Sequence, residues 1–358
     1  MKKVKKMAEK KLGYNVRVKA EKVNHEIFKE YVEIARRADD AGVYYLAIPE
    51  FFARRDPARI HCVPYMGAIA NATEHVKFGP HVLEVPLFHP KHVADIGASL
   101  DIMSNGRFIL GVGVGFQPYE YEVFGVPWNE RGKRLDESLE IMKKFWTAPR
   151  DTLVTHEGRY FKIKDECSPP CVQKPHLPIW VGGGSEAALR RTAQYGSEWT
   201  PGWVFPGQAE ESQLIALGKK WDAKKVHGLQ KGWSWEWALG KLEEYCGKFG
   251  RELVLGRPPK DPKEVGFNMT FNFNVNPDRE KAVEELKHFW VDVRKARTQG
   301  GGSLEMKLKY SAVGKAEDVI EKIDEAYKLG AYLVILYPLS TDSKAQWERV
   351  EKEILPSL

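Results

Sequence analysis

The sequence is poor in cysteine and has no long apolar run, and each absence removes a class of protein. Four cysteines in 358 residues are too few and too scattered for a disulfide framework; they are Cys62, Cys167, Cys171 and Cys246. In CSPPC (167–171) three residues separate the cysteines and no second Cys or His pair lies nearby, so we expect a proline-stiffened loop there and no metal site. No stretch approaches the roughly 18 apolar residues of a membrane span.

Charge of one sign is also not concentrated anywhere except at the start of the chain. The formal net charge is +6, and the basic residues are spread along the sequence. The opening MKKVKKMAEKK is basic but lacks the apolar stretch of a secretory signal, so we interpret 1–13 as a solvated tail. Binding to nucleic acid has no support beyond this tail, and we expect a cytoplasmic protein that contacts no membrane.

What the chain does contain is a repeated alternation of strand and helix patterns. Eight strands are predicted, each followed by a helical pattern that runs to the next strand or the chain end. The predicted strands are 14–20, 43–50, 76–85, 107–114, 178–183, 197–204, 267–276 and 331–338. Such alternation gives a parallel sheet, and eight units at this length predict a single α/β domain over 1–358, a (β/α)8 TIM barrel with insertions. An open doubly wound sheet is the alternative.

Two segments interrupt the alternation. Residues 151–163 predict a hairpin with its turn at Glu157-Gly158. Residues 226–266 are rich in tryptophan and lie between the sixth and seventh strands, where they could form a lid over a pocket. Helical packing of a long insertion is the alternative, because Trp233 and Trp237 are four residues apart.

Glycines gather at the end of the fourth predicted strand, in GRFILGVGVGFQPYEYEVFG (106–125). Function in a barrel lies at the carboxyl ends of the strands, and glycine there permits close approach of a flat ligand. A dinucleotide fingerprint is excluded, because GVGVGF lacks the G-x-G-x-x-G spacing and a loop is predicted where its helix should begin.

A second glycine cluster lies between a strand and a helix, in IWVGGGSEAALRRTAQYG. Unpaired N–H groups and a partial positive charge at a helix start can bind a phosphate that glycines allow to approach. A simple serine cap after a tight turn is the alternative. Two glycine clusters at one barrel mouth favour phosphate binding.

These segments resemble the bacterial luciferase-like flavin monooxygenase family. The resemblance rests on two signatures, residues 89–146 and PIWVGGGSEAALRRTAQYGSEW (178–199), and on the flanking EIARRADDAGVYYLAIPE and AEDVIEKIDEAYKLGAYLVIL. Members are TIM barrels, commonly dimers, that bind reduced flavin mononucleotide (FMN) or the deazaflavin coenzyme F420. The resemblance therefore implies a cofactor at the barrel mouth and a homodimer.

The family motifs imply cofactor-binding roles for particular positions. A non-proline cis peptide is implied near His81–Val82, where it would support the flavin ring. The cofactor-binding positions implied are Val82, Gly113, Gly115, Glu120 and, for the phosphate, Gly182, Gly183, Gly184 and Ser185. Arg131 and Glu137 also match the motif, and we expect them to pair with each other at a helix start.

The departures from the family concern catalysis. Phe51 and Phe52 follow Glu50 where luciferases carry histidines, and Val114 replaces the arginine that grips the phosphate there. Bioluminescence is therefore not expected. The candidates for proton transfer are Glu50 and His81, each with the alternative of a hydrogen-bonded structural role.

The function expected is that of a flavin-dependent oxidoreductase. With reduced FMN it would use molecular oxygen to oxygenate a small, apolar substrate, and a separate flavin reductase could supply the cofactor. With F420 it would instead transfer a hydride without oxygen. A flavin-binding protein without turnover is a further alternative, and the intact glycines argue against a cofactor-free scaffold.

Overall fold

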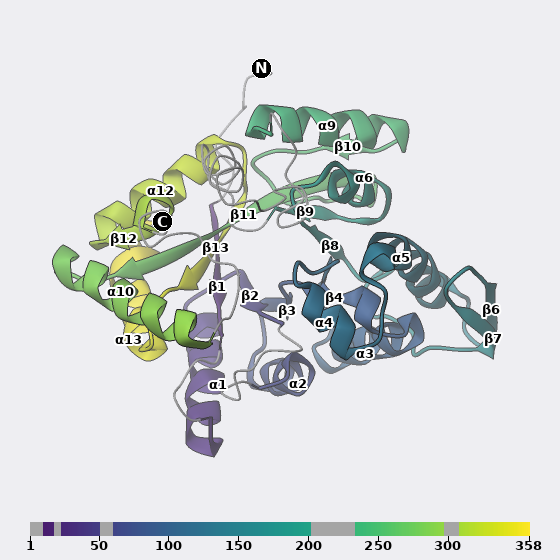
Figure 1. Cartoon of the computed structure of the whole chain (residues 1–358), viewed down its shortest axis with the longest axis horizontal. Helices are drawn as coiled ribbons and strands as arrows, with labels where there is room; N and C mark the ends of the chain where they lie inside the picture. The colour runs from purple at the N-terminus through teal and green to yellow at the C-terminus, as the bar shows by residue number, and fades with distance from the viewer. Residues whose placement is uncertain (1–9, 18–22, 51–59, 202–232, 297–307) are drawn as a thin grey trace.

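A computed structural model describes residues 10–17, 23–50, 60–201, 233–296 and 308–358. Figure 1 shows strands gathered at the centre of the molecule with helices around them. Within the described residues, no helix is both long and apolar enough to cross a membrane.

The central strands form a closed parallel barrel. Their order is β3-β2-β1-β13-β11-β9-β8-β5-β4, and every neighbouring pair in it is parallel. A parallel bridge from Phe78 of β3 to Phe108, two residues before β5, closes the barrel. The first and last strands, β1 and β13, are neighbours, which confirms the TIM barrel and excludes the open doubly wound sheet. The barrel strands are β1 (Lys11–Asn15), β2 (Tyr45–Ile48), β3 (Lys77–Pro80), β4 (Leu83–Glu84), β5 (Leu110–Gly113), β8 (Ile179–Gly182), β9 (Glu198–Thr200), β11 (Glu264–Val275) and β13 (Leu333–Pro338).

The helices begin where the sequence offers caps. The Asn24 side chain accepts the Ile27 N–H at 2.9 Å to start α1, and Pro90 is the first residue of α3. The helices are α1 (His25–Asp40), α2 (Cys62–Ala72), α3 (Pro90–Met103), α4 (Pro118–Val123), α5 (Arg131–Thr147), α6 (Glu186–Tyr195), α9 (Trp235–Lys248), α10 (Arg279–Ala296), α12 (Ala316–Lys328) and α13 (Ser343–Arg349). Short additions are the hairpin β6 (Val154–Glu157) and β7 (Lys162–Glu166), β10 (Glu252–Leu253), β12 (Ala312–Gly314), a π-helix at Val350–Ile354 and 3₁₀ turns at Val85–Leu87, Trp128–Glu130 and Leu355–Ser357.

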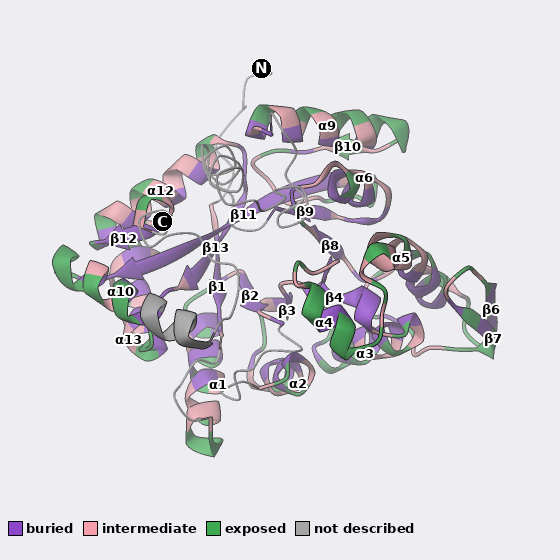
Figure 2. Cartoon of the chain, in the orientation of Figure 1, coloured by how far each residue is buried: buried purple, intermediate pink, exposed green. Residues whose placement is uncertain are grey.

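Strand β11 shows how the core is divided between the barrel interior and the helical shell. Its alternate residues Phe267 and Phe273 pack outward, against Trp235 of α9 and Tyr14 respectively. The intervening Asn268 and Thr270 face the interior of the barrel, where Asn268 donates to Glu198. Both faces are buried (Figure 2), so the barrel has an apolar outer core and a partly polar inner one.

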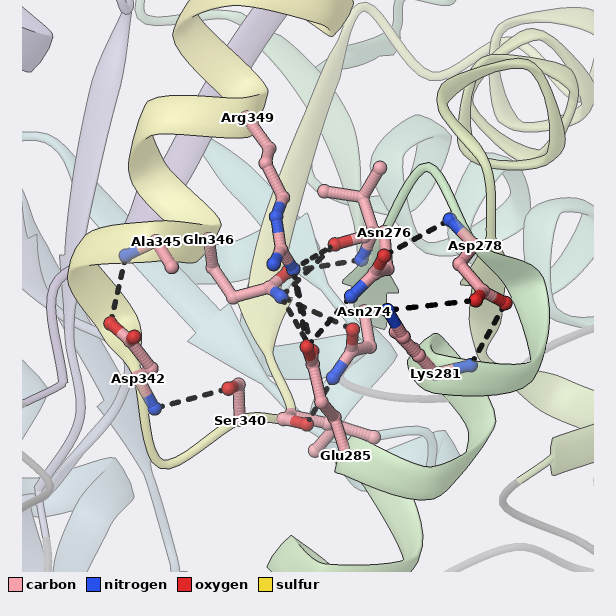
Figure 3. A network of polar contacts seen from close by, with 12 residues as sticks. Asn274, Asn276, Asp278, Lys281, Glu285, Ser340, Asp342, Ala345, Gln346 and Arg349 are labelled. Atoms are coloured by element: carbon pink, nitrogen blue, oxygen red, sulfur yellow. Dashed lines mark hydrogen bonds and ion pairs between the residues drawn. The ribbon is translucent and has the colours of Figure 1, made fainter.

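A polar network fastens the helices after β11 and β13 to the rim of the barrel (Figure 3). Gln346 of α13 donates to the Asn274 Oδ1 at 3.1 Å, and Asn276 donates to Glu285 of α10 at 2.8 Å. Arg349 lies 3.4 Å from the same Glu285 carboxylate. These contacts fix α10 and α13 relative to β11.

Several predicted boundaries were wrong. Strand β1 begins at Lys11, so the last three residues of the predicted tail 1–13 belong to the barrel. A six-residue helix, α4, stands where a loop was predicted after β5. The seventh strand begins at Glu264 rather than 267. Arg131 and Glu137 do not pair: Glu137 accepts the N–H groups of the hairpin residues 160 and 161 instead.

The tryptophan-rich segment is described from residue 233 onward. There it forms α9, which packs against α6, as the helical alternative predicted. Trp233 donates to the Gly184 carbonyl at 2.8 Å, so this insertion also contacts the second glycine cluster. Residues 226–232 of this segment lie outside the described residues, and the lid stays a prediction.

Candidate functional site

The predicted site residues lie at the carboxyl ends of β2, β3, β5 and β8, on one face of the barrel. Strands β3 and β4 are separated by two residues, His81 and Val82, whose peptide bond is cis, as the family resemblance implied. Before this bond the His81 N–H donates to the Ile48 carbonyl of β2 at 2.8 Å. The cis peptide therefore follows directly after the last hydrogen bond between β3 and β2.

The His81 ring points across the barrel interior. Its Nδ1 lies 2.8 Å from the Tyr337 hydroxyl of β13, and its Nε2 lies 2.7 Å from the Thr200 hydroxyl of β9. The Tyr337 hydroxyl donates to the His81 carbonyl at 3.2 Å, which favours Nδ1 as the N–H donor to Tyr337 and Nε2 as the acceptor from Thr200. Desolvation lowers the pKa of His81 to about 4, so the ring is neutral at physiological pH.

Val82 explains much of the glycine pattern in β5 and β8. A Cβ on Gly113 would lie 2.6 Å from a Val82 methyl group, and a Cβ on Gly182 would lie 3.0 Å from it. At Gly111 a Cβ would lie 2.1 Å from the Pro80 carbonyl oxygen. The bare backbone of GVGVG therefore makes room first for the protein's own cis segment.

Gly115 has a different reason to be glycine. Its φ is +64°, and a Cβ there would lie 2.6 Å from the carboxylate of Glu84. A side chain is thus disfavoured both by backbone conformation and by space. Together, Gly113 and Gly115 turn the chain from β5 into α4 directly beside Val82.

The second glycine cluster forms the turn from β8 into α6, with Ser185 as the cap. The Ser185 hydroxyl accepts the Ala188 N–H at 3.2 Å. Two indoles hold the preceding carbonyls: Trp199 donates to the Gly183 oxygen at 2.8 Å and Trp233 to the Gly184 oxygen at 2.8 Å. In a trans peptide the C=O and the next N–H point in opposite directions. The N–H groups of Gly184 and Ser185 therefore point away from the two tryptophans.

These two N–H groups and the exposed Gly183 make the start of α6 suitable for an anion. Gly183 has a φ of +109°, which glycine alone adopts readily. Within the described residues, neither the Gly184 nor the Ser185 N–H has a hydrogen-bond partner. The turn thus offers two donors and a positive helix end on the mouth side of the barrel.

Glu50 lies two residues after β2 and is buried, with a relative exposure of 6%. The Cys62 thiol at the start of α2 donates to its carboxylate, and burial raises the pKa of that thiol well above its usual range. Phe51 and Phe52, the positions of the missing family histidines, lie outside the described residues. The contact with Cys62 thus ties the Glu50 carboxylate to the start of α2.

Glu50, Cys62 and His61 also have ligand atoms within 4.8 Å of one another. The His61 Nδ1, however, accepts the Val63 N–H at 3.2 Å as the cap of α2, so the neutral ring carries its proton on Nε2. Metal binding through either nitrogen would cost this cap, and the three residues do not support a metal site.

Glu120 of α4 is almost fully buried, with a relative exposure of 1%. Among the described residues, neither of its carboxylate oxygens has a hydrogen-bond donor. The next residue, Tyr121, donates to the Val114 carbonyl at 2.7 Å and fixes α4 against the end of β5. A buried carboxylate without a donor is unfavourable unless a ligand supplies one.

Sequence reasoning missed the residues that hold these groups in place. Thr200, Tyr337 and Trp233 lie outside the family segments, and Trp199 ends the second signature without a role assigned to it. Each acts on a residue more than 15 positions away along the chain. For Tyr337 the signal available was positional, since it lies near the end of a predicted strand, where barrel sites form. Thr200 falls in the middle of the predicted strand 197–204, and only the structure shows that the strand ends there.

The amino-acid sequence was compared with known proteins and with sequence models of protein families. The sequence model of the family described as luciferase-like monooxygenase matches residues 14–333. The oxygenase component of a flavin-dependent trigonelline monooxygenase from Acinetobacter baylyi is 22% identical over 95% of this chain and 92% of its own length. An F420-dependent glucose-6-phosphate dehydrogenase from Microbacterium testaceum is 35% identical over 64% of this chain and 58% of its own length.

The fold agrees with the sequence match. The crystal structure of the monooxygenase RslO1 from Streptomyces bottropensis superimposes with a TM-score of 0.72 at 19% identity, covering 97% of this chain and 99% of that one. The family model alone spans most of the chain. The chain belongs to the luciferase-like monooxygenase family of flavin- and F420-dependent oxidoreductases.

Proposed function

We propose that the protein is a flavin-dependent monooxygenase that binds reduced FMN at the barrel mouth and oxygenates a small, apolar substrate. The observation that carries this proposal is the turn at Gly183–Ser185, where two backbone N–H groups are directed away from the indoles that hold their carbonyls. Val114 stands where related luciferases carry an arginine that binds the phosphate. The two N–H groups of this turn can bind a phosphate without that side chain.

The residues around the cis peptide fit a flat ring. Val82 presents its side chain between Gly113 and Gly182, and the two glycines leave no side chain beside it. We expect Val82, Gly113 and Gly115 to contact the ring and the chain that links it to the phosphate. Glu120, buried and without a donor among the described residues, would accept a hydrogen bond from a polar group of the cofactor.

Reduced FMN would supply the electrons that activate molecular oxygen, and the protein supplies positioning and protection from water. His81 is neutral and held by two hydroxyls, so it can orient a group or accept a proton but cannot act as a cationic acid near pH 7. Glu50, next to the Cys62 thiol, is the second candidate for proton transfer.

The choice of FMN over F420 is a separate step of the proposal. One reported relative is a flavin-dependent monooxygenase and another an F420-dependent dehydrogenase, so hydride transfer with F420 is the alternative. A flavin-binding protein without turnover is the third alternative. For the FMN reading we also propose a cytoplasmic homodimer supplied by a separate flavin reductase.

Anaerobic titration with reduced FMN and, separately, with reduced F420 tests the proposal, with binding read by calorimetry. We expect micromolar or tighter binding of FMN alone. Ser185→Ala removes the cap and the hydroxyl beside the phosphate, and should weaken binding by roughly 10-fold. Ser234→Ala is the matched control, because Ser234 caps α9 in the same way, accepting the Trp237 N–H at 3.1 Å.

The two serine variants should lose similar stability, about 1 kcal/mol each. Only Ser185→Ala should lose affinity. Tight binding of F420 alone would replace oxygenation by hydride transfer, and binding of neither cofactor would overturn the flavin proposal.

A further inference from the structure

The interior of the barrel contains polar side chains along its whole length. Strand β11 contributes three of them in alternate positions, Asn268, Thr270 and Asn272, all buried. The neighbouring strand β9 adds Glu198 and Thr200, also buried and also in alternate positions. These five side chains face the same interior and rise together from the amino-terminal end of the barrel toward its mouth.

At the amino-terminal end the polar groups reach the surface. Lys77, partly exposed at the start of β3, donates to the Tyr44 hydroxyl at 3.0 Å. The rings of Tyr44 and Tyr332 pack edge to face with their centroids 6.2 Å apart, and the Tyr332 hydroxyl donates to the Glu198 carboxylate. Asn268 donates to the other oxygen of Glu198 at 2.9 Å. Glu198 is thus connected to solvent on the face opposite the mouth.

At the mouth the last members are Thr200, His81 and Tyr337. Thr200 and Glu198 lie two residues apart on one face of β9, a separation of about 7 Å. Among the described residues no hydrogen bond joins Glu198 to Thr200, so a gap separates the hydrogen-bonded groups at the two ends.

The groups beside this gap are buried and incompletely bonded. Within the part of the chain that the structure describes, the Tyr45 hydroxyl, the Asn268 Oδ1 and the Thr270 hydroxyl have no hydrogen-bond partner. Tyr45 lies between the two ends, with its ring 4.4 Å from Trp180 and 6.2 Å from His81. A buried polar group without a hydrogen bond lowers the stability of the folded protein, and proteins commonly satisfy such groups with ordered water.

Glu198 is the group in this series that can change its charge near neutral pH. Desolvation raises the pKa of Glu198 to about 7, against the opposing hydrogen bonds from Tyr332 and Asn268. Lys77 of β3 also lowers the pKa of Glu198, and Glu198 in turn helps to raise the pKa of Tyr45 of β2. The effect of burial on the Glu198 carboxyl exceeds the effects of these hydrogen bonds and of Lys77.

We propose that these groups form a proton pathway through the barrel core, with Glu198 as its titrating residue, from the amino-terminal face to His81 at the mouth. Glu198 releases its proton across the gap to the Thr200 oxygen as the Thr200 hydroxyl proton passes to the His81 Nε2. The His81 Nδ1 proton then leaves through the Tyr337 hydroxyl to the group at the mouth that accepts it, so the ring stays neutral. Glu198 regains a proton from solvent along Lys77, Tyr44 and Tyr332. Each O–H or N–H bond that breaks is replaced by one that forms, and no oxidation is involved. The pathway would let a water-excluding mouth exchange protons with solvent, whichever cofactor binds.

The cofactor-free protein tests this by infrared spectroscopy. We expect a carbonyl stretching band of a buried carboxylic acid that disappears in Glu198→Gln and titrates near neutral pH. Its proton should exchange with deuterium much faster than the backbone amides of β11. Thr270→Val removes one hydroxyl beside the gap, and Tyr332→Phe removes the link to solvent. Tyr332→Phe should slow the exchange at Glu198 by about 10-fold or more.

Two controls make the result specific. Tyr327→Phe removes a tyrosine hydroxyl outside the barrel, which donates to the Lys11 carbonyl at 2.7 Å, and should leave the exchange unchanged. Thr270→Val should slow proton transfer between Glu198 and His81, read from the exchange of the His81 ring proton by NMR. The proposal is overturned if the Glu198 proton exchanges only as slowly as the β11 amides, or if Tyr332→Phe and Tyr327→Phe behave alike.

Discussion

At the scale of single residues, the site is shaped by the side chain of Val82. The cis peptide places it between β5 and β8, and the glycines of both strands leave the space that it occupies. The sequence showed the glycines plainly but offered no way to tell that the protein's own valine, as well as a ligand, required them. Motif resemblance located the cis peptide correctly, whereas periodicity alone predicted an unbroken strand over 76–85.

Gly113→Ala tests this interpretation. The new methyl group would lie 2.6 Å from a Val82 methyl, so either Val82 or the cis segment must move. We expect a loss of about 1–3 kcal/mol in the free energy of unfolding, measured by urea denaturation, together with weaker cofactor binding. Gly240→Ala is the control, because a Cβ there contacts nothing and the residue lies in the exposed face of α9. It should stabilise the protein by up to about 1 kcal/mol. Equal effects of the two substitutions would contradict the interpretation.

At the scale of secondary-structure elements, the order of the barrel could be predicted but its accessory pieces could not. The eight strands have distinct apolar runs, and their order follows from right-handed parallel connections. Helix α4 was missed because PYEYEV is too short for a helical period and begins with proline. The Thr200–His81–Tyr337 contacts join β9 and β13 to residue 81, and no local pattern encodes distances of this kind.

Arg107 closes the barrel between β3 and β5 and joins α2 to both. Its guanidinium donates to the carbonyls of Ala70, Thr73 and Val76 at 2.8, 2.8 and 3.0 Å. A lysine cannot make these bonds from one position. We therefore expect Arg107→Lys to lower the free energy of unfolding by about 2–4 kcal/mol in urea, and to increase amide exchange in β3.

A second arginine supplies the comparison. Arg36 on α1 pairs with Glu33 and Asp40, and its side chain is 50% exposed. Arg36→Lys should change stability by less than about 1 kcal/mol, because exposed ion pairs contribute little. If both substitutions had this small effect, the seam between β3 and β5 would not depend on Arg107.

At the scale of the whole molecule, two groups of the barrel interior, Glu198 and His81, make stability depend on pH in opposite directions. Glu198 has a pKa of about 7 in the folded protein against 4.5 for the unfolded reference. The native state therefore retains a proton that the unfolded chain releases, and this contribution to stability is lost as pH rises from about 4.5 to 7. His81 has a pKa of about 4 against 6.5, so its contribution is lost as pH falls from about 6.5 to 4.

Glu198→Gln separates the two contributions. The difference in the free energy of unfolding, wild type minus variant, should fall as pH rises across 4.5 to 7, by at most about 1.4 kcal/mol per pH unit, and become level above pH 7. Urea denaturation at closely spaced pH values gives the curve. The variant itself should become less stable toward low pH, because the His81 contribution remains. A difference that is flat below pH 7, or that rises, would mean that Glu198 is ionised in the folded barrel at these pH values, and the proton pathway would then lack its titrating residue.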